Sequence, residues 1–322
     1  MIKSMFHNTG LLKLKHRLFP RRELIILGYH TIEAPYFMQR VLGIGARRQD
    51  FEDQIRYVAD HFTVVSMDEL LRAVSDDTML PSNAVMITFD DGYADLYHDA
   101  LPILKEYNLP ATVFLVTECI SNRRSIWVNR LYYWLDCTHD QTFTVQITET
   151  DTLSLNLSQQ PIRRKSVLEL TAALKRMSPA ARDDTMDQIA DTLKIDATLD
   201  PSDELPMLTW QQVKELADNG IEIGSHSHTH PIMSHCSDRD CLHELTASKE
   251  IIEMQIGRPC RTVAYPNGQP DDYNEATMKA VRSAGYEAAF TFHMPLNLQS
   301  RYTIGRKPLF DVSLPEFATE LS

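Results

Sequence analysis

Short apolar runs alternate with segments of helical periodicity from residue 24 onward. This alternation is typical of β-α-β units, in which parallel strands form a sheet and helices cover its faces. Seven apolar runs have the length and composition of strands, so the pattern predicts an α/β barrel, complete or incomplete. The predicted strands are Leu24–Gly28, Phe62–Ser66, Ala84–Phe89, Ala111–Val116, Ile221–Gly224, Thr262–Tyr265 and Tyr286–Phe292.

Polar residues at the ends of two intervening segments mark helix boundaries. Thr209 and Gln212 have the spacing of a capping box, and Gly220 ends the helix that they begin. Ser237 begins another helix, which Gly257 ends. These signals place helices on both sides of the predicted strand Ile221–Gly224.

The alternation breaks between about residues 118 and 206, which we interpret as an insertion in the barrel. A threonine-rich alternating stretch, Thr142 to Leu157, predicts a hairpin, and two amphipathic helices are expected near 162–177 and 179–194. The domain prediction is therefore a basic arm at 1–22 and one barrel at 23–322 that carries the insertion. An aromatic patch begins the insertion and comprises Trp127, Tyr132, Tyr133 and Trp134.

The formal charge of −12 conceals an uneven distribution. Residues 1–22 contain six Lys or Arg and no acid, whereas the rest of the chain carries 26 basic and 44 acidic residues. An acidic body argues against nucleic acid as a partner. The arm also contains leucines, so it predicts either peripheral contact with an anionic membrane or a solvated, packed segment.

Five cysteines without a CxxC spacing favour reduced thiols over a disulfide framework. The apolar run Leu24–Gly28 is far shorter than the roughly 20 residues that span a bilayer, and no small-residue cleavage site follows it. We therefore expect a cytoplasmic protein, with contact at the inner membrane through the arm as the alternative.

Two polar clusters follow predicted strands and predict a metal site. His226 and His230 are four residues apart, which would put them on one side of a helical turn, and Asp90 and Asp91 follow the strand Ala84–Phe89. Catalytic zinc commonly takes three protein ligands and leaves one position for water. We predict Asp91, His226 and His230 as ligands and Asp90 as the base. Taken singly, either cluster is compatible with an ordinary turn or a coincidence of spacing.

Two further strand ends carry candidate catalytic groups. Pro266 and Gly268 predict a tight turn that directs the backbone N–H of Asn267 at an oxyanion. His30 follows the first strand and could protonate a departing amine. Trp127 could stack on a sugar ring, although aromatic residues at this spacing also pack the core of an insertion.

These motifs together resemble the polysaccharide deacetylases of carbohydrate esterase family 4, also called the NodB-homology domain. The resemblance covers about residues 24–310 without the insertion, and it rests on TFDDG at 88–92, HSxxH at 226–230, Tyr29-His30 and the Tyr265-Pro-x-Gly268 segment. It implies a distorted (β/α) barrel of about seven strands. It also implies one divalent metal on the second aspartate and both histidines, with the first aspartate as base.

The chain departs from the usual family pattern at two places. Ala264 occupies the position of the arginine that braces the base, and either Arg306 or Arg261 could replace it. The usual C-terminal Leu-x-His, which supplies the acid, is not found. The chain is similar to the permuted branch of poly-N-acetylglucosamine deacetylases, which implies that His30 is the acid, with His293 as the fallback.

The resulting functional prediction is a metal-dependent hydrolase that removes N-acetyl groups from an amino sugar in a polysaccharide, oligosaccharide or glycolipid. Zn²⁺ is the expected cofactor, and Co, Ni, Fe or Mn are alternatives. Competing hypotheses are a carbohydrate-binding domain with impaired catalysis, a related O-deacetylase and a metal-dependent phosphoesterase. The residues predicted to contact substrate are Tyr265, Pro266, Gly268 and Trp127.

Overall fold

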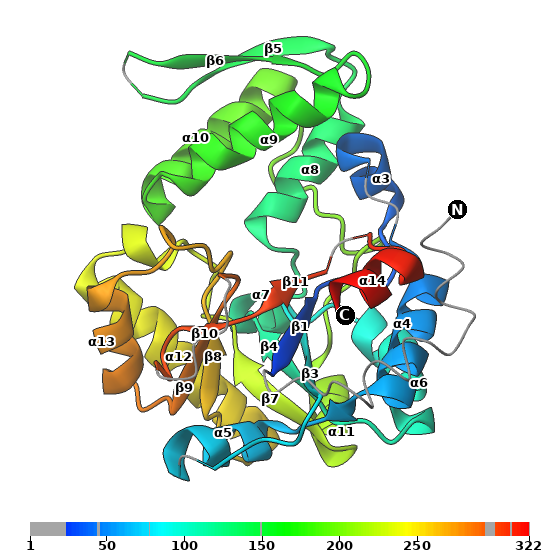
Figure 1. Ribbon diagram of the computed structural model, residues 1–322. Coiled ribbons are helices and arrows are strands. Elements are labelled where there is room, and N and C mark those ends of the chain that lie inside the picture. Colours follow the sequence, from blue (N-terminus) through cyan, green and yellow to red (C-terminus); the bar gives the residue numbers. More distant parts are fainter. Residues whose placement is uncertain are drawn as a thin grey trace.

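The computed structural model describes residues 24–43, 46–76, 78–148, 150–293, 300–309 and 311–321. Its centre is a nine-stranded sheet in which every strand pairing is parallel, with helices around it (Figure 1). The sheet order is β10-β9-β8-β7-β4-β3-β1-β11, with β2 beside β3. The strands are β1 Ile25–Tyr29, β2 Thr63–Val64, β3 Ala84–Phe89, β4 Ala111–Leu115, β7 Ile221–Ser225, β8 Thr262–Ala264, β9 Ala288–Thr291, β10 Ile304–Gly305 and β11 Lys307–Pro308.

All seven predicted strands are present, and their apolar composition has a clear cause. Every residue of β1, β3, β4, β8 and β9 is buried, because side chains on one face of the sheet fill the barrel and those on the other face meet helices. The prediction of a distorted (β/α) barrel is confirmed.

One short segment joins the two ends of the sheet. β10 pairs with β9 at one end and β11 pairs with β1 at the other, and Arg306 is the single residue between them. The backbone N–H of Arg306 donates to the carbonyl of Thr291 at 2.8 Å. The segment 304–308 therefore brings the sheet back on itself and nearly closes the barrel.

Helices surround the barrel, and several begin at the caps that the sequence predicts. Thr209 and Gln212 form the expected capping box, Ser237 caps α12, and Gly257 ends α12 in the left-handed conformation. Among the described residues, no helix combines the length and the apolar character needed to cross a bilayer. The helices of the barrel are α3 Tyr36–Leu42, α4 Arg48–His61, α5 Met67–Asp76, the π-helical turn η1 Leu96–Ala100, α6 Leu101–Glu106, α11 Trp210–Asp218, the 3₁₀ turn η2 Met233–His235, α12 Asp238–Ile256, α13 Glu275–Ser283 and α14 Leu314–Glu320.

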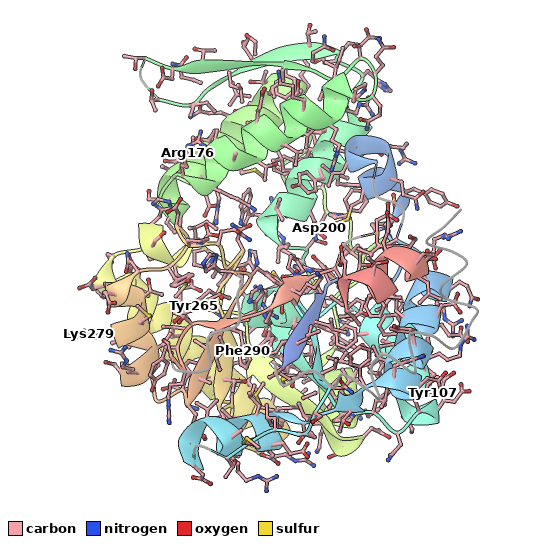
Figure 2. The ribbon with its side chains drawn as sticks, viewed as in Figure 1. Tyr107, Arg176, Asp200, Tyr265, Lys279 and Phe290 are labelled. Carbon is pink, nitrogen blue, oxygen red and sulfur yellow. The ribbon has the colours of Figure 1, made fainter. Side chains whose placement is uncertain are left out.

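After β4, the helix α7 (Thr117–Asn122) lies beside the barrel strands, and the chain from there to α11 forms a group of helices and a hairpin above the barrel in Figure 1. Side chains of the hairpin alternate, with Phe143 and Val145 buried and the neighbouring threonines exposed. Asp200, labelled in Figure 2, lies between this group and the barrel, where its carboxylate accepts the backbone N–H of Ser125. The elements are α7 Thr117–Asn122, α8 Trp127–Cys137, β5 Thr142–Gln146, β6 Thr152–Asn156, α9 Ile162–Lys175 and α10 Pro179–Leu193.

The predicted hairpin and both amphipathic helices are therefore confirmed. Tyr132 and Trp134 are buried within this group, so this part of the aromatic patch packs a core. The predicted basic arm at residues 1–22 lies outside the described residues.

Candidate metal centre and active site

The predicted catalytic residues meet at the carboxyl ends of neighbouring strands. Asp90 and Asp91 follow β3, and the N–H of Asp90 donates to the carbonyl of Tyr29 at the end of β1. His226 follows β7, and its N–H donates to the carbonyl of Leu115 on β4. Because all these strands are parallel, residues far apart in the sequence lie together at one end of the barrel.

Asp91, His226 and His230 form one compact cluster of possible metal ligands. Each residue is buried and offers one atom, and the three atoms lie within 4.8 Å of one another. Oδ1 of Asp91 is 3.6 Å from Nε2 of His226 and 3.5 Å from Nε2 of His230. The structure thus brings together the three side chains predicted as ligands.

The chemistry of these side chains fits one divalent cation. Oδ1 of Asp91 is buried and has no hydrogen-bond partner among the described residues, which is costly unless a cation occupies the space beside it. Nδ1 of His226 bonds the Ala264 carbonyl at 2.8 Å and so leaves Nε2 free for a metal. Two imidazoles and a carboxylate are a common donor set of catalytic zinc.

Burial also sets the ionisation of the cluster. Burial lowers the pKa of His226 and of His230, which keeps both imidazoles in the neutral form that binds metals. Burial and the neighbouring Asp90 raise the pKa of Asp91, against the opposing charge of His30. A bound cation would hold Asp91 ionised.

The prediction that the two histidines share a helical turn is wrong. Ser227 and His230 have φ values of +67° and +59°, so this segment is a loop with two residues in the left-handed region. Ser227 Oγ accepts the N–H of His230 at 3.0 Å. The loop is also held by Glu244 of α12, which accepts the N–H groups of His228 and Thr229, each at 2.8 Å.

Glu244 therefore shapes the ligand loop, although it belongs to no motif that the sequence reveals. A carboxylate inside a regular amphipathic helix carries no local sign that it reaches another loop. His228 lies between the two histidine ligands in the sequence but is not part of the ligand cluster, and its Nδ1 lies 2.9 Å from Oγ1 of Thr117.

Arg306 supplies the brace of the predicted base. Its two terminal nitrogens bond the two carboxylate oxygens of Asp90 at 2.6 and 2.7 Å, and both side chains are fully buried. Burial alone would raise the pKa of Asp90, but the charge and the hydrogen bonds of Arg306 outweigh it and lower the pKa to about 2. Asp90 is thus ionised at neutral pH.

This contact decides between the two arginines that the sequence left open. Arg261 pairs with Asp68 and Glu222, at 2.7 and 2.8 Å, and has no contact with the base. Arg306 also lies over the ring of Phe292, with 4.2 Å from its guanidinium carbon to the ring centre. Ala264 stands where the usual family pattern has an arginine, and Arg306, in the segment 304–308 that closes the barrel, takes the place of that arginine.

His30, the predicted acid, lies beside both aspartates. It is half-buried and stacks on Phe292 with 5.6 Å between ring centres. Burial lowers the pKa of His30, and the charges of Asp91 and Asp90 oppose that shift. The fallback residue, His293, is exposed and its N–H donates to Thr291.

The turn after β8 has the predicted tight geometry. Asn267 and Gly268 have φ values of +62° and +65°, and the N–H of Gly268 donates to the carbonyl of Pro266 at 2.7 Å. A Cβ on Gly268 would lie 2.8 Å from the backbone nitrogen of Phe292, so the turn has no room for a larger residue. The backbone N–H of Asn267 has no hydrogen-bond partner among the described residues.

Two residues predicted to contact substrate have other roles. Tyr265, labelled in Figure 2, is fully buried, donates its hydroxyl to the carbonyl of Tyr302 at 3.0 Å and stacks on Tyr273. Trp127 is 7% exposed, and the Arg182 guanidinium covers its ring at 5.0 Å. Both aromatic rings are buried and covered by other side chains, so neither offers a face on which a sugar ring could stack. Pro266 is buried as well.

Residues of the insertion support the ligand cluster. The hydroxyl of Tyr93 donates to Oδ2 of Asp91 at 2.8 Å and accepts the side-chain amide of Asn129 on α8 at 2.7 Å. The indole N–H of Trp127 donates to the carbonyl of His230 at 3.3 Å. Sequence reasoning missed Tyr93 and Asn129, because neither their spacing nor their type indicates that they meet.

Comparisons with known proteins agree with this geometry. A family model described as polysaccharide deacetylase matches residues 78–154 and 156–289. YxkH of Bacillus subtilis, whose name carries the same family description, is 22% identical over 270 residues, which are 84% of this chain and 64% of that protein. A poly-β-1,6-N-acetyl-D-glucosamine N-deacetylase of Staphylococcus epidermidis is 33% identical over 75 residues, or 23% of this chain and 26% of that protein. The chain thus matches less than two thirds of the length of these curated relatives.

Solved structures show the same fold. The deacetylase PplD of Streptococcus pyogenes, in complex with acetate, has a TM-score of 0.60 and 18% identity over 92% of this chain and 97% of that one. IcaB from Ammonifex degensii has a TM-score of 0.61 and 17% identity over 94% and 98% of the two chains. With the family model matching well over half of the sequence, the chain belongs to the polysaccharide deacetylase family.

Proposed function

We propose that this protein is a metal-dependent hydrolase that removes N-acetyl groups from an N-acetylated amino sugar in a polysaccharide, oligosaccharide or glycolipid. The observation that carries the proposal is a buried, ionised Asp90, braced by Arg306, directly beside the ligand cluster of Asp91, His226 and His230. A base next to a group of metal ligands is an arrangement that can catalyse the hydrolysis of an unactivated amide.

One divalent metal is the proposed cofactor, held by the three ligand residues. Zn²⁺ suits this donor set best, and Co, Ni, Fe or Mn are alternatives because affinity and availability together decide which metal is bound. When bound, the metal lowers the pKa of a coordinated water and polarises the acetyl carbonyl.

The residues of the chain then divide the proton transfers between them. Asp90, kept ionised by Arg306, takes a proton from the attacking water, and its Oδ2 lies 3.7 Å from Nε2 of His226, at the edge of the ligand cluster. The backbone N–H of Asn267 donates to the oxygen that becomes negatively charged. His30 gives a proton to the departing amine; burial lowers the pKa of His30, and the charges of Asp91 and Asp90 oppose that shift.

The substrate class is proposed from the relatives. Proteins of Staphylococcus epidermidis and Staphylococcus aureus that share 33% and 28% identity with parts of this chain bear the name poly-β-1,6-N-acetyl-D-glucosamine N-deacetylase. This supports an N-acetylglucosamine-containing glycan as substrate.

A glycan-binding domain with impaired catalysis is the second candidate. An arginine missing at Ala264 would favour this candidate, but Arg306 pairs with Asp90 and so supports an active enzyme. An O-deacetylase would use the same residues, so only the substrate distinguishes it.

The decisive experiment is a scan of N-acetylated and O-acetylated glycans for acetate release, with and without a chelator. We expect chelator-sensitive loss of acetyl groups from N-acetylglucosamine oligomers, detected by mass spectrometry. Asp90→Asn should lower turnover by about 10²- to 10⁴-fold while the metal is retained. Full turnover of Asp90→Asn would contradict the assignment of the base.

For location, we propose a cytoplasmic protein, with peripheral contact at the inner membrane through residues 1–22 as the alternative to a solvated or packed arm. The six basic residues and the leucines of this arm support the proposal. Co-sedimentation with vesicles containing anionic lipid should fall when residues 1–22 are removed, and equal sedimentation of both proteins would contradict it.

A further inference from the structure

The last residue of α9, Lys175, reaches from the insertion to the turn that carries Asn267. The ammonium group of Lys175 donates to Oδ1 of Asn267. The side-chain amide nitrogen of Asn267 in turn donates to Asp272. Asp272 also accepts the backbone N–H of Gln269 at 2.7 Å. Hydrogen bonds with Lys175 and Asp272 therefore fix both ends of the Asn267 amide group, and Lys175 belongs to the insertion. Arg176, the next residue, is labelled in Figure 2.

The ammonium group of Lys175 bonds the neutral amide oxygen of Asn267 and forms no ion pair with a described carboxylate. The side chain is only partly exposed, and burial lowers its pKa, while the charges of Asp272 and Asp91 oppose that shift. Its charge also acts on His230, where burial, His226 and then Lys175 lower the pKa. The hydrogen bond to Asn267 places the ammonium at the turn after β8, next to the loop that carries the histidine ligands, since the carbonyl of Ala264 at the end of β8 bonds Nδ1 of His226 at 2.8 Å.

We propose that Lys175 is a positioning residue of the active site, contributed by the insertion, which fixes the Asn267 turn and places a positive charge beside Asp91 and His230. The inference rests on the proposed deacetylase function, because the turn matters there as the donor to the oxyanion. It gives the insertion a role in the reaction besides packing.

Two consequences of opposite sign follow from this position. A positive charge beside a divalent cation repels it, so its removal should tighten metal binding. Loss of the hydrogen bond to Asn267 should loosen the oxyanion donor and slow turnover. A lysine that only stabilised the fold would weaken both properties together.

The test compares Lys175→Met with Lys175→Arg and with Lys165→Met. Lys165 lies ten residues earlier on α9, about 15 Å along the axis, and its side chain is 78% exposed and pairs with Glu169. Zinc affinity is measured on the metal-free proteins by competition with a chromogenic chelator. Turnover is measured on the N-acetylglucosamine oligomer that the wild-type protein deacetylates.

For Lys175→Met we expect zinc to bind about threefold to tenfold more tightly, and kcat to fall about tenfold or more with KM nearly unchanged. Lys175→Arg should restore wild-type zinc affinity and part of kcat, and Lys165→Met should match the wild type in both. In an Asn267→Gly background, which tolerates the positive φ, Lys175→Met should cost little further turnover because both changes act on one turn.

Unchanged zinc affinity and kcat in a folded Lys175→Met protein would overturn the proposal. So would weaker zinc binding with a lower melting temperature, because that pattern indicates a structural role alone. If the wild-type protein released acetate from no glycan, the proposed function would fail, and the zinc affinities would still decide whether Lys175 acts on the metal site. Normal wild-type activity with no change in Lys175→Met would overturn the Lys175 inference alone.

Discussion

At the scale of single residues, the site depends on the pairing of Asp90 with Arg306. The family motif around Asp90 is visible in the sequence, but its partner is 216 residues away and has no motif of its own. Sequence reasoning reached two candidate arginines and could not choose, because only the path of the chain puts a guanidinium within 2.7 Å of the carboxylate. Local motifs thus identify the acidic residue and leave its counter-charge undetermined.

Replacing Arg306 with Met should be strongly destabilising, because it leaves Asp90 as a buried carboxylate without a counter-charge. The expected loss is about 3–5 kcal/mol in the free energy of unfolding, together with loss of deacetylase activity. Urea denaturation at pH 7 measures the first effect. Arg261→Met is the matched control, because that arginine is partly exposed in its ion pairs and should cost about 1 kcal/mol or less. Equal losses in the two variants would contradict the special role of Arg306.

At the scale of elements, the loops after the strands are held by partners that lie on other helices. Glu244 of α12 fixes the loop between the two histidine ligands, and the two left-handed residues there explain why the predicted helical turn is absent. Strand ends and helix caps could be predicted because apolar runs and capping residues are local signals. Contacts such as that of Asn129 with Tyr93 could not, because they depend on how the insertion packs.

A similar contact holds the loop after β1 and makes stability depend on pH. Oδ2 of Asp95 accepts the hydroxyl of Thr31 and the N–H of Ile32, both at 2.6 Å, directly after His30. Burial raises the pKa of Asp95 to about 6, so the folded protein favours the neutral acid more than the unfolded chain does. The stability that neutral Asp95 gives the folded protein is therefore fully present below about pH 4 and is lost as the pH rises through about 6.

Asp95→Asn keeps an acceptor at this position and removes the titration. Relative to the wild type, the variant should gain up to about 3 kcal/mol between pH 4 and pH 7, as measured by urea denaturation of the metal-free proteins. Asp60→Asn on the exposed surface of α4 is the control and should show no such trend. A pH-independent difference between Asp95→Asn and the wild type would contradict the assignment.

At the scale of the whole molecule, closure of the barrel and assembly of the site use the same residues. The two-residue strands β10 and β11 carry no apolar run, so the sequence did not predict them, and they appear only because β9 and β1 offer open edges. Phe292 lies at this junction, where it contacts Arg306 and stacks on His30.

A substitution of Gly28 tests whether closure of the barrel and catalysis depend on each other, because the absence of a side chain at Gly28 makes room for Phe292. A Cβ at Gly28 would lie 2.3 Å from the Phe292 ring, so Gly28→Ala should displace that ring. We expect a loss of about 1–3 kcal/mol in the free energy of unfolding and a larger fractional loss of kcat than the stability change explains. Gly285→Ala is the control, because its φ of +79° strains an alanine and costs stability at a position with no neighbour within 4 Å, so kcat should stay at the wild-type value. Wild-type kcat in Gly28→Ala would show that the junction does not support catalysis.

The placement of Arg306 in the closing segment has a consequence for biosynthesis. On the ribosome, Asp90 leaves the exit tunnel long before the arginine that neutralises its charge is translated, since 216 residues separate them. A nascent chain therefore holds its reactive carboxylate without a counter-ion until the segment 304–308 docks. The paired base and the closed barrel are therefore completed in the same folding step, and a polypeptide released before Arg306 is translated has neither.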